Sequence, residues 1–181
     1  MAKSNNTLCL DKFYPERDLM ITDIAQQSDK IIIQMKSTSS SCKCPKCNRI
    51  TQKYHGTYTR KVQDLPILGK QVQLEICSHE YACLNDECEA VSIAETFDGF
   101  LNNYSRMTER CADFICTLAL ETSCEGCARV CHTLGIKTSG DTVIRLLLKR
   151  YESLPKPEVS DVIGVDDFAY KKRHTYAMSL T

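Results

Sequence analysis

Two closely spaced cysteine pairs constrain this chain more than any other feature. Cys44-Pro45-Lys46-Cys47 is followed, after 35 intervening residues, by Cys83 and Cys88. Tetrahedral Zn²⁺ is commonly held by two such pairs, because each pair occupies one short turn and the chain between them folds back. Four thiolates leave no coordination position open, so the ion stabilises the fold and does not activate water. The sequence therefore predicts a structural Zn²⁺ site with four ligands: Cys44, Cys47, Cys83 and Cys88.

Other residues compete for places in this site. Cys42 gives the first pair a third candidate thiol, but the two-residue spacing of Cys44 and Cys47 suits a metal-binding turn better. His55 and His79 are not expected to be ligands, because four cysteines already complete the site. The alternative is a set of reduced cysteines without metal, which both spacings and Pro45 make the weaker interpretation.

Composition and charge place the chain in a broad class. It has 181 residues, 12 cysteines and a formal net charge of zero. The first residues lead into no apolar signal core, so we expect reduced thiols and a cytoplasmic protein. No apolar run approaches the ~20 residues that cross a bilayer, so no membrane partner is expected.

The first half of the chain carries strand patterns. The segments Leu19 to Ile24 and Lys30 to Met35 predict a hairpin beside the zinc module. Between the thiol pairs, Ile50 to Thr59 and Gln71 to Ile76 also predict strands, and Asp64 to Gly69 predicts the turn that joins them.

The period then becomes helical. Helices are predicted from about Ser105 to Thr122 and from Ser123 to Leu134, the second ended by Gly135. Thr138 and Asp141 have the spacing of a capping box and predict the start of a third helix. Helix, short helix, glycine turn and a helix with basic residues is the order of a helix-turn-helix.

That order predicts which residues meet DNA. Residues at the start of the third helix are expected to face base edges, and basic residues at its flanks are expected to lie near phosphates. The first group is Ser139, Asp141, Thr142 and Arg145, and the second is Lys137, Lys149 and Arg150. An ordinary three-helix bundle without a DNA role is the open alternative. Cys127 and Cys131, four residues apart on one helix, are expected to pack in the core.

Beyond the third helix the chain changes character again. Leu154 to Glu158, with Pro155 and Pro157, predicts a linker. Val162 to Phe168 predicts an apolar strand that ends in the paired carboxylates Asp166 and Asp167. Carboxylates at a strand end can hold Mg²⁺ for phosphoryl transfer, although two-metal chemistry needs further acids.

Taken in order, these motifs resemble the ISL-three insertion-sequence transposases of bacteria. The resemblance covers almost the whole chain and rests on five segments: Cys44-Pro45-x-Cys47, Asp64-Leu65-Pro66 with Gly69, Cys83-x-Asn85-x2-Cys88, Ser139 to Arg145, and Ile163 to Lys172 with His174-Thr175-Tyr176.

The resemblance implies a zinc-binding module and a helix-turn-helix that together recognise the terminal inverted repeats of double-stranded DNA. It also implies a ribonuclease-H-like catalytic domain, whose three acids bind Mg²⁺ or Mn²⁺ in a full-length relative. Asp166 matches the first of these acids, with Asp167 ranked behind it. The second and third acids have no match before Thr181, so we expect a truncated, catalytically incomplete transposase.

The expected fold is α+β in four parts. These are an N-terminal hairpin region (1–40), a zinc-binding module (41–98), a helix-turn-helix domain (99–153), and a linker with the start of the catalytic domain (154–181). The alternative function is a free-standing zinc-containing transcription regulator. An unpaired apolar strand such as Val162 to Val165 can pair with another chain, so a homodimer is among the expected partners.

Overall fold

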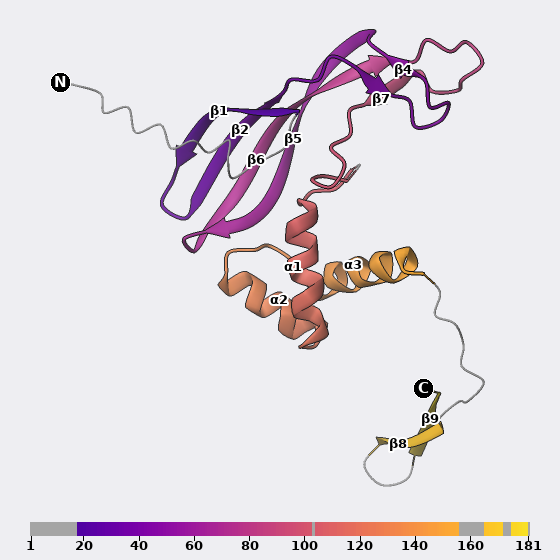
Figure 1. Cartoon of the computed structure of the whole chain (residues 1–181). Coiled ribbons are helices and arrows are strands. Elements are labelled where there is room, and N and C mark those ends of the chain that lie inside the picture. Colours follow the sequence, from indigo (N-terminus) through magenta and orange to yellow (C-terminus); the bar gives the residue numbers. More distant parts are fainter. Residues whose placement is uncertain (1–17, 103, 156–164, 172–174, 181) are drawn as a thin grey trace, which may run out of the picture. The chain divides into compact units, whose positions relative to one another are not determined.

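Figure 1 shows the computed structural model, which describes residues 18–102, 104–155, 165–171 and 175–180, the last two ranges by their backbone only. The chain forms two compact units that divide after Leu148. The first holds a mixed sheet and helices, and the second holds a β-hairpin. The predicted α+β class is confirmed.

Five strands make the main sheet. They are β1 (Leu19–Gln26), β2 (Lys30–Ser37), β5 (Tyr54–Ile67), β6 (Lys70–Ala82) and β7 (Ser92–Ala94). The order is β1-β2-β6-β5, with β7 pairing with β6. The predicted N-terminal hairpin is present as β1 and β2, and the parallel pairing of β2 with β6 makes it part of the same sheet as the long β5-β6 hairpin.

One face of this sheet carries the hydrophobic core. Side chains alternate along each strand, so every second residue points to the same face. Val62 of β5, Leu74 of β6 and Ile33 of β2 are almost fully buried there. Phe97, Phe100 and Leu101, which follow β7, pack into the same cluster. Burying each large apolar side chain stabilises the fold by about 1.5–3 kcal/mol.

The turn predicted from Asp64 to Gly69 is wrong in extent. β5 continues to Ile67, and only Leu68 and Gly69 form the turn, with φ angles of 51° and 73°. Two consecutive positive φ angles make the two-residue turn whose twist suits a hairpin. The register shifts between Asp64 and Ile67, and β5 is an edge strand, so the chain accommodates Pro66.

Three helices follow the sheet, at the predicted places but with shorter bounds: α1 (Glu109–Leu120), α2 (Cys124–Thr133) and α3 (Gly140–Ser153). Their shared core includes Cys111, Ile115, Cys127, Cys131 and Val143, each fully buried. The sulfur atoms of Cys127 and Cys131 lie 3.9 Å apart. The prediction that these two cysteines pack as small hydrophobic residues is confirmed.

The helix starts differ from the predicted ones for local reasons. Ser105 donates a hydrogen bond to the carbonyl of Met107 before the helix, and the hydroxyl of Thr108 caps α1 instead. The capping box predicted for Thr138 and Asp141 is wrong, because the Ser139 hydroxyl accepts the hydrogen bond from the backbone N–H of Thr142, at 3.3 Å. The cap is therefore one residue later than the pattern indicated.

The second unit contains the predicted acidic strand. β8 (Val165–Lys171) pairs antiparallel with β9 (Thr175–Leu180), and Asp166 is opposite Ser179 while Asp167 is opposite Met178. The predicted strand residues 162–164 and the predicted linker residues 156–158 lie outside the described residues.

Candidate metal centre and its attachment to the helices

The first cysteine pair occupies a tight turn inside a short hairpin. β3 (Cys42–Lys43) pairs with β4 (Ile50–Thr51), and the turn between them carries Cys44 and Cys47. The N–H of Cys44 donates to the carbonyl of Arg49, and the N–H of Asn48 donates to the carbonyl of Cys44, both at 2.9 Å. Asn48 has a φ of 59°, a left-handed conformation that asparagine tolerates better than most residues.

The second pair follows the end of β6. Cys83 comes directly after the strand, and the N–H of Cys88 donates to the carbonyl of Asn85 at 2.9 Å, which closes a second turn. Two hydrogen bonds of 2.8 Å join the turns, since Ala82 accepts from the Thr51 hydroxyl and donates its N–H to the carbonyl of Lys53. These two bonds hold the turns together without any contribution from the cysteine side chains.

The four predicted thiols converge on one point. The sulfur atoms of Cys44, Cys47, Cys83 and Cys88 all lie within 4.8 Å of one another. Cys44 Sγ is 3.8 Å from Cys88 Sγ, and Cys47 Sγ is 3.7 Å from Cys83 Sγ. A regular tetrahedron with Zn–S bonds of about 2.3 Å separates its sulfur atoms by about 3.8 Å. The donor set and its spacing therefore fit a structural Zn²⁺.

Local hydrogen bonds distribute charge unevenly among these thiols. The N–H of Arg49 lowers the pKa of Cys47 to about 6. At Cys83 the N–H of Asn85 also favours the thiolate, but burial and hydrogen bonds with the other three thiols outweigh it and raise the pKa to about 11. Cys47 therefore ionises before Cys83, and a cation bound among the thiols would favour the thiolate form of each.

The rejected ligand candidates lie outside the cluster. Cys42 Sγ contacts the carbonyls of Lys43 and Ala94, and the residue is buried. His79 Nδ1 lies 3.2 Å from the carbonyl of Ser39, and the side chain of His55 is exposed. Cys42, Cys44, Tyr81 and Ile93 form a small core beneath the site, so burial of Cys42 has an explanation without metal.

The residues predicted to meet DNA lie on α3 and the turn before it. Arg145 and Lys149 are both exposed and one turn apart, and Lys137 is exposed in the turn. Arg145 Nε donates to the carbonyl of Asp141 at 3.3 Å. The Ser139 hydroxyl is engaged by the cap and lies 3.0 Å from the Thr142 hydroxyl, which leaves Arg145 and the exposed Asp141 as the freer polar side chains. Arg150 is exposed near the end of α3.

A glutamine that the sequence did not single out attaches this turn to the sheet. The side-chain amide of Gln63, on β5, donates to the carbonyl of Lys137 at 3.2 Å and accepts from the N–H of Lys137 at 2.8 Å. The backbone of Gln63 also accepts from the N–H of Thr108 and donates to the carbonyl of Arg106. One strand residue therefore fixes both the start of α1 and the turn before α3.

Its neighbour Asp64 makes the second attachment. Asp64 is buried, and its carboxylate accepts from the Thr108 hydroxyl at 2.7 Å and from Arg110 Nε at 2.8 Å, while a second Arg110 nitrogen contacts its other oxygen. Burial alone would raise the pKa of Asp64, but the bonds from Arg110 and Thr108 outweigh it and lower the pKa. The only sequence signal for this contact was the place of Asp64 in the Asp-Leu-Pro motif.

Comparison with known proteins finds a match to the region that holds the four thiols. The family model described as the zinc-finger of transposase IS204/IS1001/IS1096/IS1165 matches residues 40–88, the range that holds all four thiols. The chain is also 27% identical over 151 residues to the transposase for insertion sequence element IS1001 of Bordetella parapertussis.

These matches confirm the resemblance to the ISL-three insertion-sequence transposases. The aligned part covers 80% of this chain and 34% of the Bordetella protein, so the chain spans about a third of that relative's length. No solved structure matches the chain. Among the described residues, no helix combines the length and apolar character of a membrane span.

Proposed function

We propose that this chain provides the DNA-binding part of an insertion-sequence transposase and recognises the terminal inverted repeats of its element. The observation that carries the proposal is the four-thiol cluster within a region similar to the transposase zinc finger, on the sheet to which the α2-α3 turn is attached by Gln63. In this proposal α1 to α3 form a helix-turn-helix. The domains are the four parts expected from the sequence.

The sheet gives α3 a fixed orientation for reading DNA. Zn²⁺ would supply no reaction here, and its contribution would be to crosslink the β3-β4 turn to the turn that follows β6. Gln63 holds the backbone of Lys137, so the start of α3 is placed by hydrogen bonds and not by a free loop. Arg145 would then reach a base edge, and Lys149 a phosphate. Asp141 and Thr142 would contribute further base contacts, and Lys137 and Arg150 further phosphate contacts.

The proposal also concerns catalysis. Asp166 on β8 would be the first acid of a ribonuclease-H-like domain, as in the family that the motifs resemble. Two-metal strand cleavage needs carboxylates from more than one strand, so Asp166 alone would not cut DNA. A dimer related by a two-fold axis would match repeats that are inverted relative to each other.

The test is binding of a labelled fragment containing the element's terminal repeat, measured by fluorescence anisotropy over a series of salt concentrations, with a scrambled fragment as reference. Arg145→Ala should reduce the preference for the repeat by about tenfold. Lys149→Ala should weaken both fragments equally and lower the salt slope by about one. Lys36→Ala, which removes an exposed charge on β2, is the matched control.

The fragment should stay uncut when Mg²⁺ or Mn²⁺ is added. Absence of binding at low salt, or unchanged binding by both the Arg145 and Lys149 variants, would refute the DNA-binding role. Tight binding to another site with no preference for terminal repeats would instead support a transcription regulator.

A further inference from the structure

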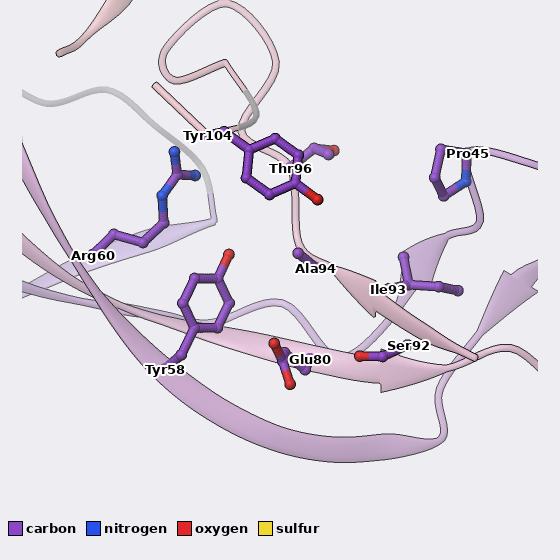
Figure 2. A pocket seen from close by; sticks show the side chains of 9 residues that line it. All are labelled: Pro45, Tyr58, Arg60, Glu80, Ser92, Ile93, Ala94, Thr96 and Tyr104. Carbon is purple, nitrogen blue, oxygen red and sulfur yellow. The ribbon is translucent and has the colours of Figure 1, made fainter. Parts of the chain in front are cut away.

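A pocket beside the zinc module has features that the proposed DNA contacts of α3 do not use. It has a volume of about 380 Å³, within the range of small-molecule sites. Figure 2 shows that its wall comes from β5, β6, β7, the segment after β7, and Pro45 of the first cysteine turn. Side chains from five places in the chain therefore meet around one space.

Two tyrosines and a carboxylate give this space its chemistry. Tyr58 projects from β5 toward the side on which Tyr104 lies, and Glu80 is beside the base of Tyr58 (Figure 2). Tyr104 is 97% exposed, so its ring contributes almost nothing to the core. Aromatic rings presented to solvent at a pocket provide stacking surfaces for planar ligands.

The conformation of Tyr104 is imposed by neighbours. Its φ is 59°, a left-handed conformation that is unfavourable for a bulky side chain. Arg60, also in the pocket wall, donates from one guanidinium nitrogen to the carbonyls of Asn102 and Ser105, both at 3.0 Å. These bonds fix the backbone at Asn102 and Ser105, on either side of Tyr104. The remaining N–H groups of Arg60 can still donate to a phosphate.

Space and polarity at the floor favour one kind of ligand. Glu80 is paired across the strands with Gly56, and nothing lies within 4 Å of the position where a Gly56 side chain would begin. A carboxylate accepts hydrogen bonds from an exocyclic amine, which adenine, cytosine and guanine carry and thymine lacks.

We propose that this pocket binds one unstacked nucleobase with an exocyclic amine, adenine, cytosine or guanine, while α3 holds the adjoining duplex. The base stacks on Tyr104 and Tyr58, its amine donates to Glu80, and Arg60 contacts the neighbouring phosphate. This inference rests on the proposed function, because the base belongs to the bound DNA. Extrusion of a base is least costly where pairing is already broken, so the site would read a mismatch, bulge or frayed end.

The test compares three labelled duplexes that differ only in one extrahelical nucleotide: adenine, thymine or an abasic residue. All three carry the same number of phosphates, so differences in affinity report the base and not the charge. The wild-type protein should bind the adenine duplex about tenfold more tightly than the abasic one, because stacking on an aromatic side chain is worth about a factor of ten. Thymine should fall between them.

Three variants locate the effect. Tyr104→Ala should remove the preference for adenine, and its exposure means that the fold is not disturbed. Glu80→Gln should reduce the adenine preference over thymine and keep the stacking preference over the abasic residue. Tyr54→Ala is the control: Tyr54 is an exposed tyrosine on β5 that does not line the pocket, so its removal should leave both preferences unchanged.

The outcomes separate this inference from the proposed function. Salt-dependent binding of all three duplexes with equal affinity would overturn the pocket and leave the DNA-binding role intact. A preference for adenine without salt-dependent binding of the duplex would support the pocket and contradict the role of α3. An adenine preference that persists in the Tyr104 variant would also overturn the pocket.

Discussion

Replacing Arg110 tests how the sheet is attached to the helices. Arg110→Ala leaves the Asp64 carboxylate buried without its cation, whereas Asp64→Ala leaves a guanidinium that is already 42% exposed and can turn to solvent. Leaving a buried charge unpaired costs about 3–5 kcal/mol. Losing charge-assisted hydrogen bonds whose donor can rehydrate costs about 1.5–3 kcal/mol. We therefore expect Arg110→Ala to lower the free energy of unfolding more than Asp64→Ala does.

The pH dependence gives the same reasoning a second readout. In the wild type the pKa of Asp64 is lowered, so its contribution to stability is complete above the unfolded-state pKa of about 3.9 and is lost as the pH falls through the folded-state value. In Arg110→Ala the carboxyl loses its cation but keeps the hydrogen bonds from the Thr108 hydroxyl and the N–H of Leu65, while burial raises its pKa. Protonation then relieves the penalty, so the difference between wild type and Arg110→Ala should shrink as the pH falls from 7 toward 4.

Urea unfolding followed by circular dichroism measures both quantities. Any acid sensitivity of the thiolate cluster is common to both proteins and cancels in the difference between them. Arg106→Ala, which removes an exposed arginine nearby, should change the stability by less than about 0.5 kcal/mol. A larger loss for Asp64→Ala than for Arg110→Ala, or a difference that grows on acidification, would refute this account of the attachment.

Two further substitutions test local features of the fold. Ser123→Ala removes the hydroxyl that accepts from the N–H of Gly126 at 3.1 Å, and it should cost about 1 kcal/mol in urea unfolding, whereas an unchanged midpoint would show that the cap is dispensable. Gly69→Val places a β-branched residue at a φ of 73° in the β5-β6 turn and should cost at least about 1–2 kcal/mol, with Gly56→Ala, which meets no atom within 4 Å, as the milder comparison; equal stability of the two variants would contradict the turn geometry.

The sequence was most informative where chemistry is encoded by spacing. The four thiols could be predicted because two short turns with paired cysteines have few other uses, and Gly135 marked the end of α2 because its φ of 88° suits glycine. The helices were found by their period. α1 nevertheless begins later than the period indicated, because the hydroxyl of Thr108, and not that of Ser105, accepts from the N–H of Cys111 in the first turn.

Long-range contacts were the part that the sequence could not supply. Asp64, Pro66 and Gly69 form a strong local turn pattern, yet Asp64 lies in a strand because its carboxylate is satisfied by residues more than 40 positions away. Gln63 carries no motif, and its contact with Lys137 depends on where the sheet and the helices meet. Tyr104 lies in no sequence motif, and its place beside Tyr58 and Glu80 depends on the fold.

The most direct test of the account is a titration of the reduced, metal-free protein with Co²⁺, followed by displacement with Zn²⁺. We expect one equivalent of Co²⁺ to produce the intense thiolate-to-metal absorption of a tetrahedral four-sulfur site, and Zn²⁺ to abolish it. Cys42→Ser should leave this spectrum unchanged, while Cys44→Ser should weaken it and the affinity. Binding that survives Cys44→Ser but is lost with Cys42→Ser, or no tetrahedral spectrum at one equivalent, would contradict the metal centre on which the account depends.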